Sequence, residues 1–234
     1  MNNTVFLPGL NKQVEFLLNR INLLNLDCLV IGSNSEEVAK IIQTQSQKDV
    51  EIIVEDYDTL MNCKLSLKAI DSVSVKMMEF EVTDYPNGKF DLVFVQGSIT
   101  NKKRKIIIKE IKRILKPNGY FCVGEIVKLK NTIPTFVAEL FERANLEPLN
   151  KDEFFNYYLE RKFELVDSVD LSNSLKEYYN ANIKLLNEKV KSLASNEKSY
   201  YKKVVNQIKH ESNAYLNLGA DRYMGFEVIL LKKE

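Results

Sequence analysis

The stretch Cys28–Ala39 is the part of the sequence best suited to bind a small molecule. An apolar run leads into Gly32-Ser33-Asn34, and an amphipathic segment follows. In alternating α/β chains, a buried strand that turns sharply into a helix is where nucleotide-like cofactors bind. A three-glycine fingerprint would place further glycines where this chain has Asn34 and Glu36. The sequence therefore predicts the turn, but the residues of the turn do not establish that it binds a ligand.

Other reactive side chains are scarce. The single histidine, His210, lies in a Lys/Glu-rich helical stretch, which argues against most hydrolase triads and histidine-based zinc sites. Cys28, Cys63 and Cys122 form no CxxC pair, and two of them fall in apolar runs, so we interpret them as reduced packing residues. We expect no metal site, and the sequence identifies no catalytic residue.

The elements that must position the Gly32 turn alternate between strand and helix. Apolar periodicity predicts a first helix from Val14 to Leu24, and Ser35 is placed to cap the helix after the turn. Strands are expected at 27–32, 50–55, 73–80, 90–95, 120–126, 163–169 and 223–231, and further helices at 58–69, 105–115, 136–141 and 154–159. A turn is expected at Lys116–Gly119, between the 105–115 helix and the next strand.

This order predicts an α/β fold: a Rossmann-like, doubly wound, mostly parallel seven-stranded sheet with an antiparallel last strand and a helical insertion before it. We expect one domain over residues 1–234, with a helical lead-in (1–26), a core (27–170), an insertion (171–212) and a final strand (222–232). The final strand is expected to pair antiparallel with Phe163–Val169.

Composition excludes several classes of partner. Thirty-three basic and 32 acidic residues leave a net charge of +1, so nucleic acid is an unlikely partner. No basic, apolar leader is evident, and no segment approaches the roughly 20 apolar residues of a membrane helix. We therefore expect a cytoplasmic protein without membrane contact. Whether the insertion mediates a homodimer is left open.

Four blocks of sequence resemble the class I S-adenosylmethionine-dependent methyltransferases, in particular the small-molecule branch that includes the ubiquinone, menaquinone and arsenite methyltransferases. They are Leu7-Pro8-Gly9, Cys28–Ala39, Ile53–Met61, and Phe90–Gly97 with the helix that ends before Gly119. The resemblance covers roughly residues 5–127. It implies methyl transfer from S-adenosylmethionine to a small-molecule acceptor by in-line displacement, which needs positioning more than an acid–base pair.

The resemblance also implies where the cofactor would lie. Its methionine part would rest against Gly32, Ser33 and Asn34, and Asp56, or Glu55 after a one-residue slip, would accept hydrogen bonds from the ribose. Glu79 and Phe80 would meet the adenine. Gln96 and Gly97 would end a strand beside the reactive methyl group. Each of these residues also has a plain structural interpretation as a solvated acid or a core side chain.

Two departures from the family pattern support an alternative, a catalytically inactive methyltransferase-like binding or scaffold protein. Val30 stands where the family usually has an acid, and Glu36 replaces a glycine. Glu36 and Glu37 at a helix start would repel a pyrophosphate, which disfavours a dinucleotide, whereas S-adenosylmethionine carries a sulfonium cation. Asn34 is a mild departure, because asparagine tolerates left-handed backbone conformations.

Two further features could bear on function. The basic run Lys102–Lys105 opens a helix, where cations oppose the dipole, and is the only hint of RNA as a substrate or ligand. Tyr178, Tyr179 and His210, in the helical insertion, are candidate lid residues, although helix packing explains most such aromatic residues equally well.

Overall fold

A twisted eight-stranded sheet organises the computed structural model, which describes residues 5–192 and 202–234. Residues 1–4 of the expected lead-in and 193–201 of the expected insertion lie outside this description. The strands are β1 (Cys28–Ile31), β2 (Val50–Val54), β3 (Val73–Met77), β4 (Phe90–Gln96), β5 (Leu115–Lys128), β6 (Leu149–Asn150), β7 (Phe163–Asp170) and β8 (Met224–Lys233). The helices are α1 (Lys12–Leu18), α2 (Glu36–Ser46), α3 (Tyr57–Ser66), α4 (Arg104–Ile114), α5 (Thr135–Arg143), α6 (Lys151–Leu159), α7 (Ser174–Ser192) and α9 (Lys202–Asn217), with a 3₁₀ turn η1 (Ala220–Arg222).

The strand order is β3-β2-β1-β4-β5-β8-β7, with the two-residue β6 beside the end of β5. Strands β1 to β6 pair in parallel, and β8 runs antiparallel to both β5 and β7. The predicted α/β class, the parallel core and the antiparallel last strand are therefore confirmed. β6 is the one strand that the sequence did not predict, because two residues are too short to show a period.

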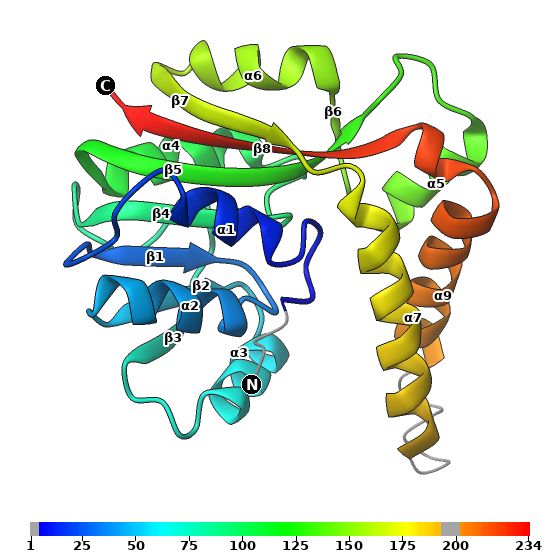
Figure 1. Ribbon diagram of the computed structural model, residues 1–234, viewed down its shortest axis with the longest axis horizontal. Coiled ribbons are helices and arrows are strands. Elements are labelled where there is room, and N and C mark those ends of the chain that lie inside the picture. The colour runs from blue at the N-terminus through cyan, green and yellow to red at the C-terminus, as the bar shows by residue number, and fades with distance from the viewer. Residues whose placement is uncertain (1–4, 193–201) are drawn as a thin grey trace.

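Helices cover both faces of the sheet (Figure 1). Apolar side chains of α1, α2 and α3 pack on one face, and those of α4 and α6 pack on the other. All three cysteines are free and buried among these side chains, as expected. The α7–α9 pair stands beyond the carboxyl ends of the parallel strands, next to α5. This arrangement places a helical wall at the edge of the sheet where ligands bind in open α/β folds.

Two of the predicted boundaries failed because of the local backbone conformation. α1 ends at Leu18, so the expected helix to Leu24 is wrong; the backbone turns at Asn19 and adopts a left-handed conformation at Asn25. The expected turn at Lys116–Gly119 lies within β5, which pairs with β4 from Leu115 onward and accommodates a left-handed Asn118 through a shift in register. The periodicity of apolar residues in the sequence does not reveal either of these local changes in the backbone.

Ion pairs explain the basic run at the start of α4. Lys103 pairs with Glu81, and Lys102 lies 3.9 Å from Glu147. Arg104 is buried and binds Glu125 at 2.7 Å. Three of the four cations thus meet carboxylates, which removes the observation on which RNA binding depended.

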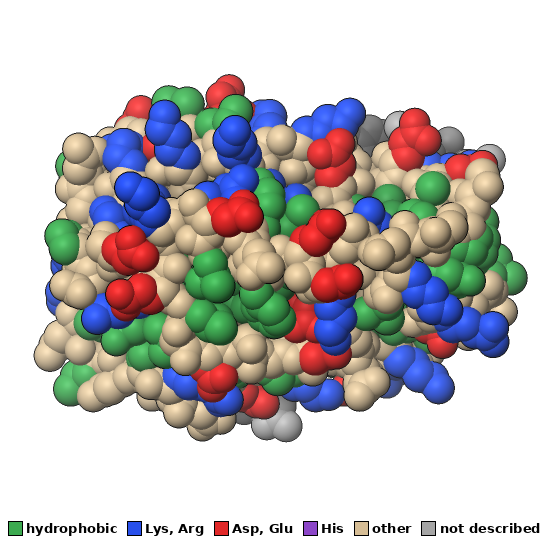
Figure 2. Space-filling model, turned by 90° about the horizontal axis from the view of Figure 1, so that it is seen from above, with side chains coloured by type: hydrophobic (Ala, Val, Ile, Leu, Met, Phe, Trp, Pro, Cys, Tyr) green, Lys and Arg blue, Asp and Glu red, His purple; other side chains and the backbone are tan. Residues whose placement is uncertain are grey.

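The surface carries charges of both signs close together. On the face seen from above, Lys and Arg side chains lie next to Asp and Glu side chains, with hydrophobic side chains between them (Figure 2). Within the described ranges, no helix combines the length and apolar character required to cross a membrane.

Candidate functional site

A crevice of about 390 Å³ lies at the carboxyl ends of β1, β2 and β4. The predicted site residues that line it are Ser33, Asn34, Glu55, Asp56, Phe80, Gln96 and Gly97. Seven of the nine predicted residues thus surround one hollow, and the two that do not line it are Gly32 and Glu79. The volume falls within the range of small-molecule sites.

The turn after β1 has the backbone that the sequence suggests, but two side chains act differently. Asn34 is left-handed at φ 57°, as expected. A side chain on Gly32, whose φ is +127°, would lie 2.6 Å from the Ser98 Cβ, so Ser98 occupies the space that glycine leaves. Ser35 precedes α2 but does not cap it through its side chain, since its hydroxyl donates back to the Gly32 carbonyl at 2.5 Å. These contacts hold the turn closed against β4.

The two acids after β2 are in different states. Asp56 caps α3: its oxygens accept from the Thr59 backbone N–H at 2.8 Å and from the Thr59 hydroxyl at 2.7 Å, which lowers the pKa of Asp56. Burial raises the pKa of Glu55, although a hydrogen bond from the Phe80 backbone opposes this shift. Asp56 thus has a structural task, and Glu55 is the carboxylate held in the crevice at a desolvation cost.

The residues after β3 divide between crevice and solvent. Phe80 is 4% exposed and lines the crevice, whereas Glu79 is exposed and forms an isolated bridge with Val82. The expected strand to Phe80 ends at Met77. Phe80 therefore has the position that a ring-supporting residue needs, while Glu79 would have to turn inward to reach a ligand.

Gln96 fastens the N-terminal segment over the crevice. Its side-chain nitrogen donates to the carbonyls of Pro8 at 2.7 Å and Leu10 at 2.9 Å. The side-chain oxygen is buried and has no protein partner among the described residues. Gly97, with φ +75°, lies against Pro8. Gln96 is thus a positioning residue that retains one acceptor atom for a ligand.

Sequence reasoning missed most of the wall that the helices contribute. Tyr178 and Tyr179 of α7 line the crevice, as the lid interpretation allowed, and Tyr179 stacks on Tyr215 with ring centroids 4.6 Å apart. Gln207 and Glu211 of α9 line it too and were not predicted. A signal for Glu211 exists: it lies between Ile208 and Tyr215 at helical spacing, on the inward stripe of α9.

The crevice has a one-sided charge. Glu55, Asp56 and Glu211 line it, and no lysine, arginine or histidine does so among the described residues. Burial raises the pKa of Glu211 as well as that of Glu55. Such a hollow favours a ligand that carries positive charge and hydroxyl donors, and it disfavours a phosphate. The described chain holds no cluster of three or more His, Cys, Asp or Glu side chains that could bind a metal ion.

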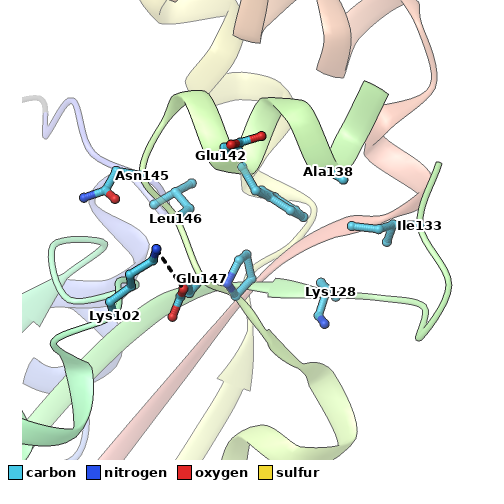
Figure 3. Close-up of a pocket in the computed structure, with 10 residues that line it drawn as sticks. Lys102, Lys128, Ile133, Ala138, Glu142, Asn145, Leu146 and Glu147 are labelled. Carbon is cyan, nitrogen blue, oxygen red and sulfur yellow. Dashed lines mark ion pairs between the residues drawn. The ribbon is translucent and has the colours of Figure 1, made fainter. Parts of the chain in front are cut away.

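Two further hollows adjoin the crevice. One, of about 440 Å³, shares Leu146 with it and is drawn in Figure 3, where Lys102 and Glu147 turn toward each other and Lys128 projects from β5. The other, of about 510 Å³, lies between α5 and α9 and shares Gln207 and Glu211 with the crevice.

Comparison with known proteins bears on this geometry. Residues 29–123 match a methyltransferase domain. The match spans β1 to the middle of β5, and so includes the turn after β1, both acids after β2 and the end of β4. No curated protein matched the chain.

Solved structures share the fold over nearly the whole chain. A candidate sarcosine dimethylglycine methyltransferase from Galdieria sulphuraria has a TM-score of 0.78 at 13% identity, covering 96% of this chain and 84% of that one. The cyclase SpnF gives 0.73 at 15% identity, with 95% and 80% covered. A geranyl diphosphate methyltransferase in complex with S-adenosylmethionine gives 0.70 at 13%, with 96% and 85% covered. The domain match supports the resemblance to class I S-adenosylmethionine-dependent methyltransferases, the solved structures show the shared fold, and the branch within that class is not resolved.

Proposed function

We propose that the chain binds S-adenosylmethionine in the crevice and transfers its methyl group to a small-molecule acceptor. The observation that carries this proposal is the convergence of seven predicted residues on one hollow lined by carboxylates and by no cation among the described residues. A sulfonium cofactor with a ribose and no phosphate has the matching chemistry. The methyltransferase domain match over the same strands supports the proposal.

The residues present fit most of this ligand. Glu55 would accept the ribose hydroxyls, because the Asp56 oxygens already accept from Thr59. Phe80 would support the adenine. Ser33, Asn34 and Gly97 would surround the methionine part, and the unpartnered oxygen of Gln96 would accept a hydrogen bond there. Gly32 fits less well, since Ser98 fills the space beside it.

Bound S-adenosylmethionine supplies an electrophilic methyl group on a positively charged sulfur. The chain's own contribution is to hold the acceptor in line and to exclude water, which can supply much of such a reaction's rate. Pro8, held by Gln96, and the tyrosines of α7 line the crevice and would help to exclude water. The acceptor would enter beside Gly97, at the end of β4.

Isothermal titration of the full chain with S-adenosylmethionine and with S-adenosylhomocysteine tests the proposal. We expect one site for each ligand, thermal stabilisation by both, and no competition from NAD. The matched pair of variants is Glu55→Gln, which should weaken binding, and Glu79→Gln, which changes an exposed acid outside the crevice and should not. Absence of heat and of stabilisation at millimolar ligand would contradict the proposal.

The alternative is a binding protein without turnover, and specific observations favour it. Val30 is a buried core residue where the family has an acid, and Glu36 is directed at the buried Cys63 thiol rather than at a ligand. SpnF, which shares this fold, is named as a cyclase and not as a methyltransferase. Transfer of a labelled methyl group to any acceptor would exclude the alternative.

A further inference from the structure

A second hollow adjoins the crevice at α9, where the two spaces share lining side chains. This second hollow, the α5–α9 hollow, is lined by Leu140, Arg143, Asn206, Gln207, His210 and Glu211. Among the described residues, Gln207 and Glu211 alone line both spaces. In-line transfer requires the donor and the acceptor to meet, and Glu211 lies at the boundary between the two spaces.

Glu211 is held in place without a counter-ion. Its Oε1 accepts from the Gln207 side chain at 2.9 Å. No lysine or arginine in the described part of the chain forms an ion pair with it, and Arg143 across the hollow pairs with Glu139 at 3.7 Å. Burial raises the pKa of Glu211, and the nearby His210 opposes that shift. A partly desolvated carboxylate in this state is stabilised by a cationic ligand.

The side chains around Glu211 favour a cation of one kind. Tyr178 and Tyr179 line the same crevice, and their rings lie 5.0 Å apart, centroid to centroid. Tyrosine rings attract ammonium groups through their negative faces, and a carboxylate adds a charge-assisted hydrogen bond. A phenol can donate one hydrogen bond to the carboxylate but gains no cation–π contact, and an ionised carboxylic acid is repelled by Glu211. Glu211 and the two tyrosines together favour an amine over the other common methyl acceptors.

We propose that Glu211 binds an amine acceptor as its ammonium ion and removes the proton that blocks the nitrogen lone pair. This inference rests on the proposed methyl transfer and names its substrate class. One N–H bond breaks and an O–H bond forms on Glu211. The nitrogen lone pair then forms the bond to the methyl carbon as the carbon–sulfur bond breaks, and that electron pair stays on sulfur. Glu211 afterwards releases its proton to water, so the products are a methylammonium ion, a neutral thioether and one proton.

The hollow at β5 offers the contrasting interpretation. Lys128 projects there and Lys102 is directed at Glu147, with Leu146 shared with the crevice (Figure 3). An anionic acceptor would use Lys128. The two interpretations predict ligands of opposite charge, and they predict that substitution of different residues weakens binding. Binding measurements alone can therefore separate them.

The test titrates the full chain, with and without S-adenosylhomocysteine, with three probes of similar shape: benzylammonium, benzyl alcohol and benzoate. We expect benzylammonium to bind at least 10-fold more tightly than the other two. Glu211→Gln should abolish that preference. The matched control, Glu177→Gln, removes the same charge from an exposed position on α7 outside the crevice and should keep it.

Several results would overturn the inference. These are equal binding of benzyl alcohol, unchanged benzylammonium affinity in Glu211→Gln, absence of benzylammonium binding, or benzoate binding that is lost in Lys128→Gln. Binding of S-adenosylhomocysteine is measured separately, so failure of the cofactor proposal is recognised independently. Circular dichroism and thermal melts of both variants distinguish loss of recognition from loss of folding.

Discussion

Acids at the amino-terminal edge of the sheet and acids in the crevice at its carboxyl edge are in opposite states. At the amino-terminal edge, Lys116 reaches both Asp27 and Asp91 at 2.7 Å, and Lys48 reaches Asp27 at 2.7 Å. At the carboxyl edge, Glu55 and Glu211 line a crevice without any basic side chain among its described residues. These lysines lower the pKa of Asp27, whereas burial raises the pKa of Glu55 and of Glu211.

The difference teaches how to separate stabilising charges from charges that await a ligand. A neutralised acid contributes to folding, and its removal should cost stability. An acid that is partly desolvated in the crevice and forms no ion pair costs stability, and its removal should cost only what it binds. Perturbed acids gather at functional sites for this reason.

The largest effect is expected where a neutralised pair is also fully buried. Arg104 and Glu125 are 5% and 1% exposed, and the Tyr158 hydroxyl donates to the same carboxylate. Arg104→Met leaves Glu125 buried without a cation, and we expect a loss of about 3–5 kcal/mol in the free energy of unfolding. Urea denaturation measures this. Arg143→Met, which breaks an exposed pair, should change stability by less than about 0.5 kcal/mol. Similar losses in both variants would contradict the comparison.

The next effect concerns the crevice. Glu55→Gln removes a carboxylate charge and should weaken S-adenosylhomocysteine binding by about 1.5–3 kcal/mol, or roughly 10- to 150-fold. Because burial raises the pKa of Glu55, the same substitution should leave the melting temperature unchanged or higher at pH 7. Calorimetric titration and a thermal melt give both numbers. If Glu55→Gln binds S-adenosylhomocysteine normally but has a lower melting temperature, Glu55 stabilises the fold and does not bind the ligand.

A smaller effect is expected at the opposite edge. Lys116→Met removes the cation shared by Asp27 and Asp91, but these side chains are 26–40% exposed, so water screens much of the loss. We expect about 1 kcal/mol lower stability and unchanged cofactor affinity. Lys68→Met, at an exposed position, serves as the control. Weakened binding in Lys116→Met would show that the edges are coupled.

The smallest effect is a pH dependence. The pKa of Asp27 in the folded chain lies below its ordinary value of 3.8, because Lys116 and Lys48 hydrogen-bond to the ionised form. Its contribution is therefore complete above about pH 3.8 and is lost as the pH falls through the lowered pKa. The stability difference between the wild type and Asp27→Asn should shrink as the pH falls from about 3.8 through the lowered pKa. A difference that stays constant over this range would contradict the assignment.

The sequence predicted what depends on neighbouring residues. Asn34, Glu55, Asp56, Phe80, Gln96 and Gly97 all line one crevice, because each ends or follows a strand that the sequence predicted. Their use as cofactor ligands stays a prediction. The sequence could not show that Ser98 fills the space beside Gly32 or that Gln96 holds Pro8, since both contacts join separate segments. Glu211 was missed for the same reason: its place depends on how α9 packs across the crevice.

The Gln96 contacts have a consequence for synthesis. Gln96 fastens carbonyls that precede it by 88 and 86 residues, and the crevice draws side chains from Leu7 through Glu211. During synthesis the residues near Leu7 are made first, but the crevice cannot be completed until α9 has been made and has packed against it. Occupancy by a ligand would report that almost the entire polypeptide has been made and assembled.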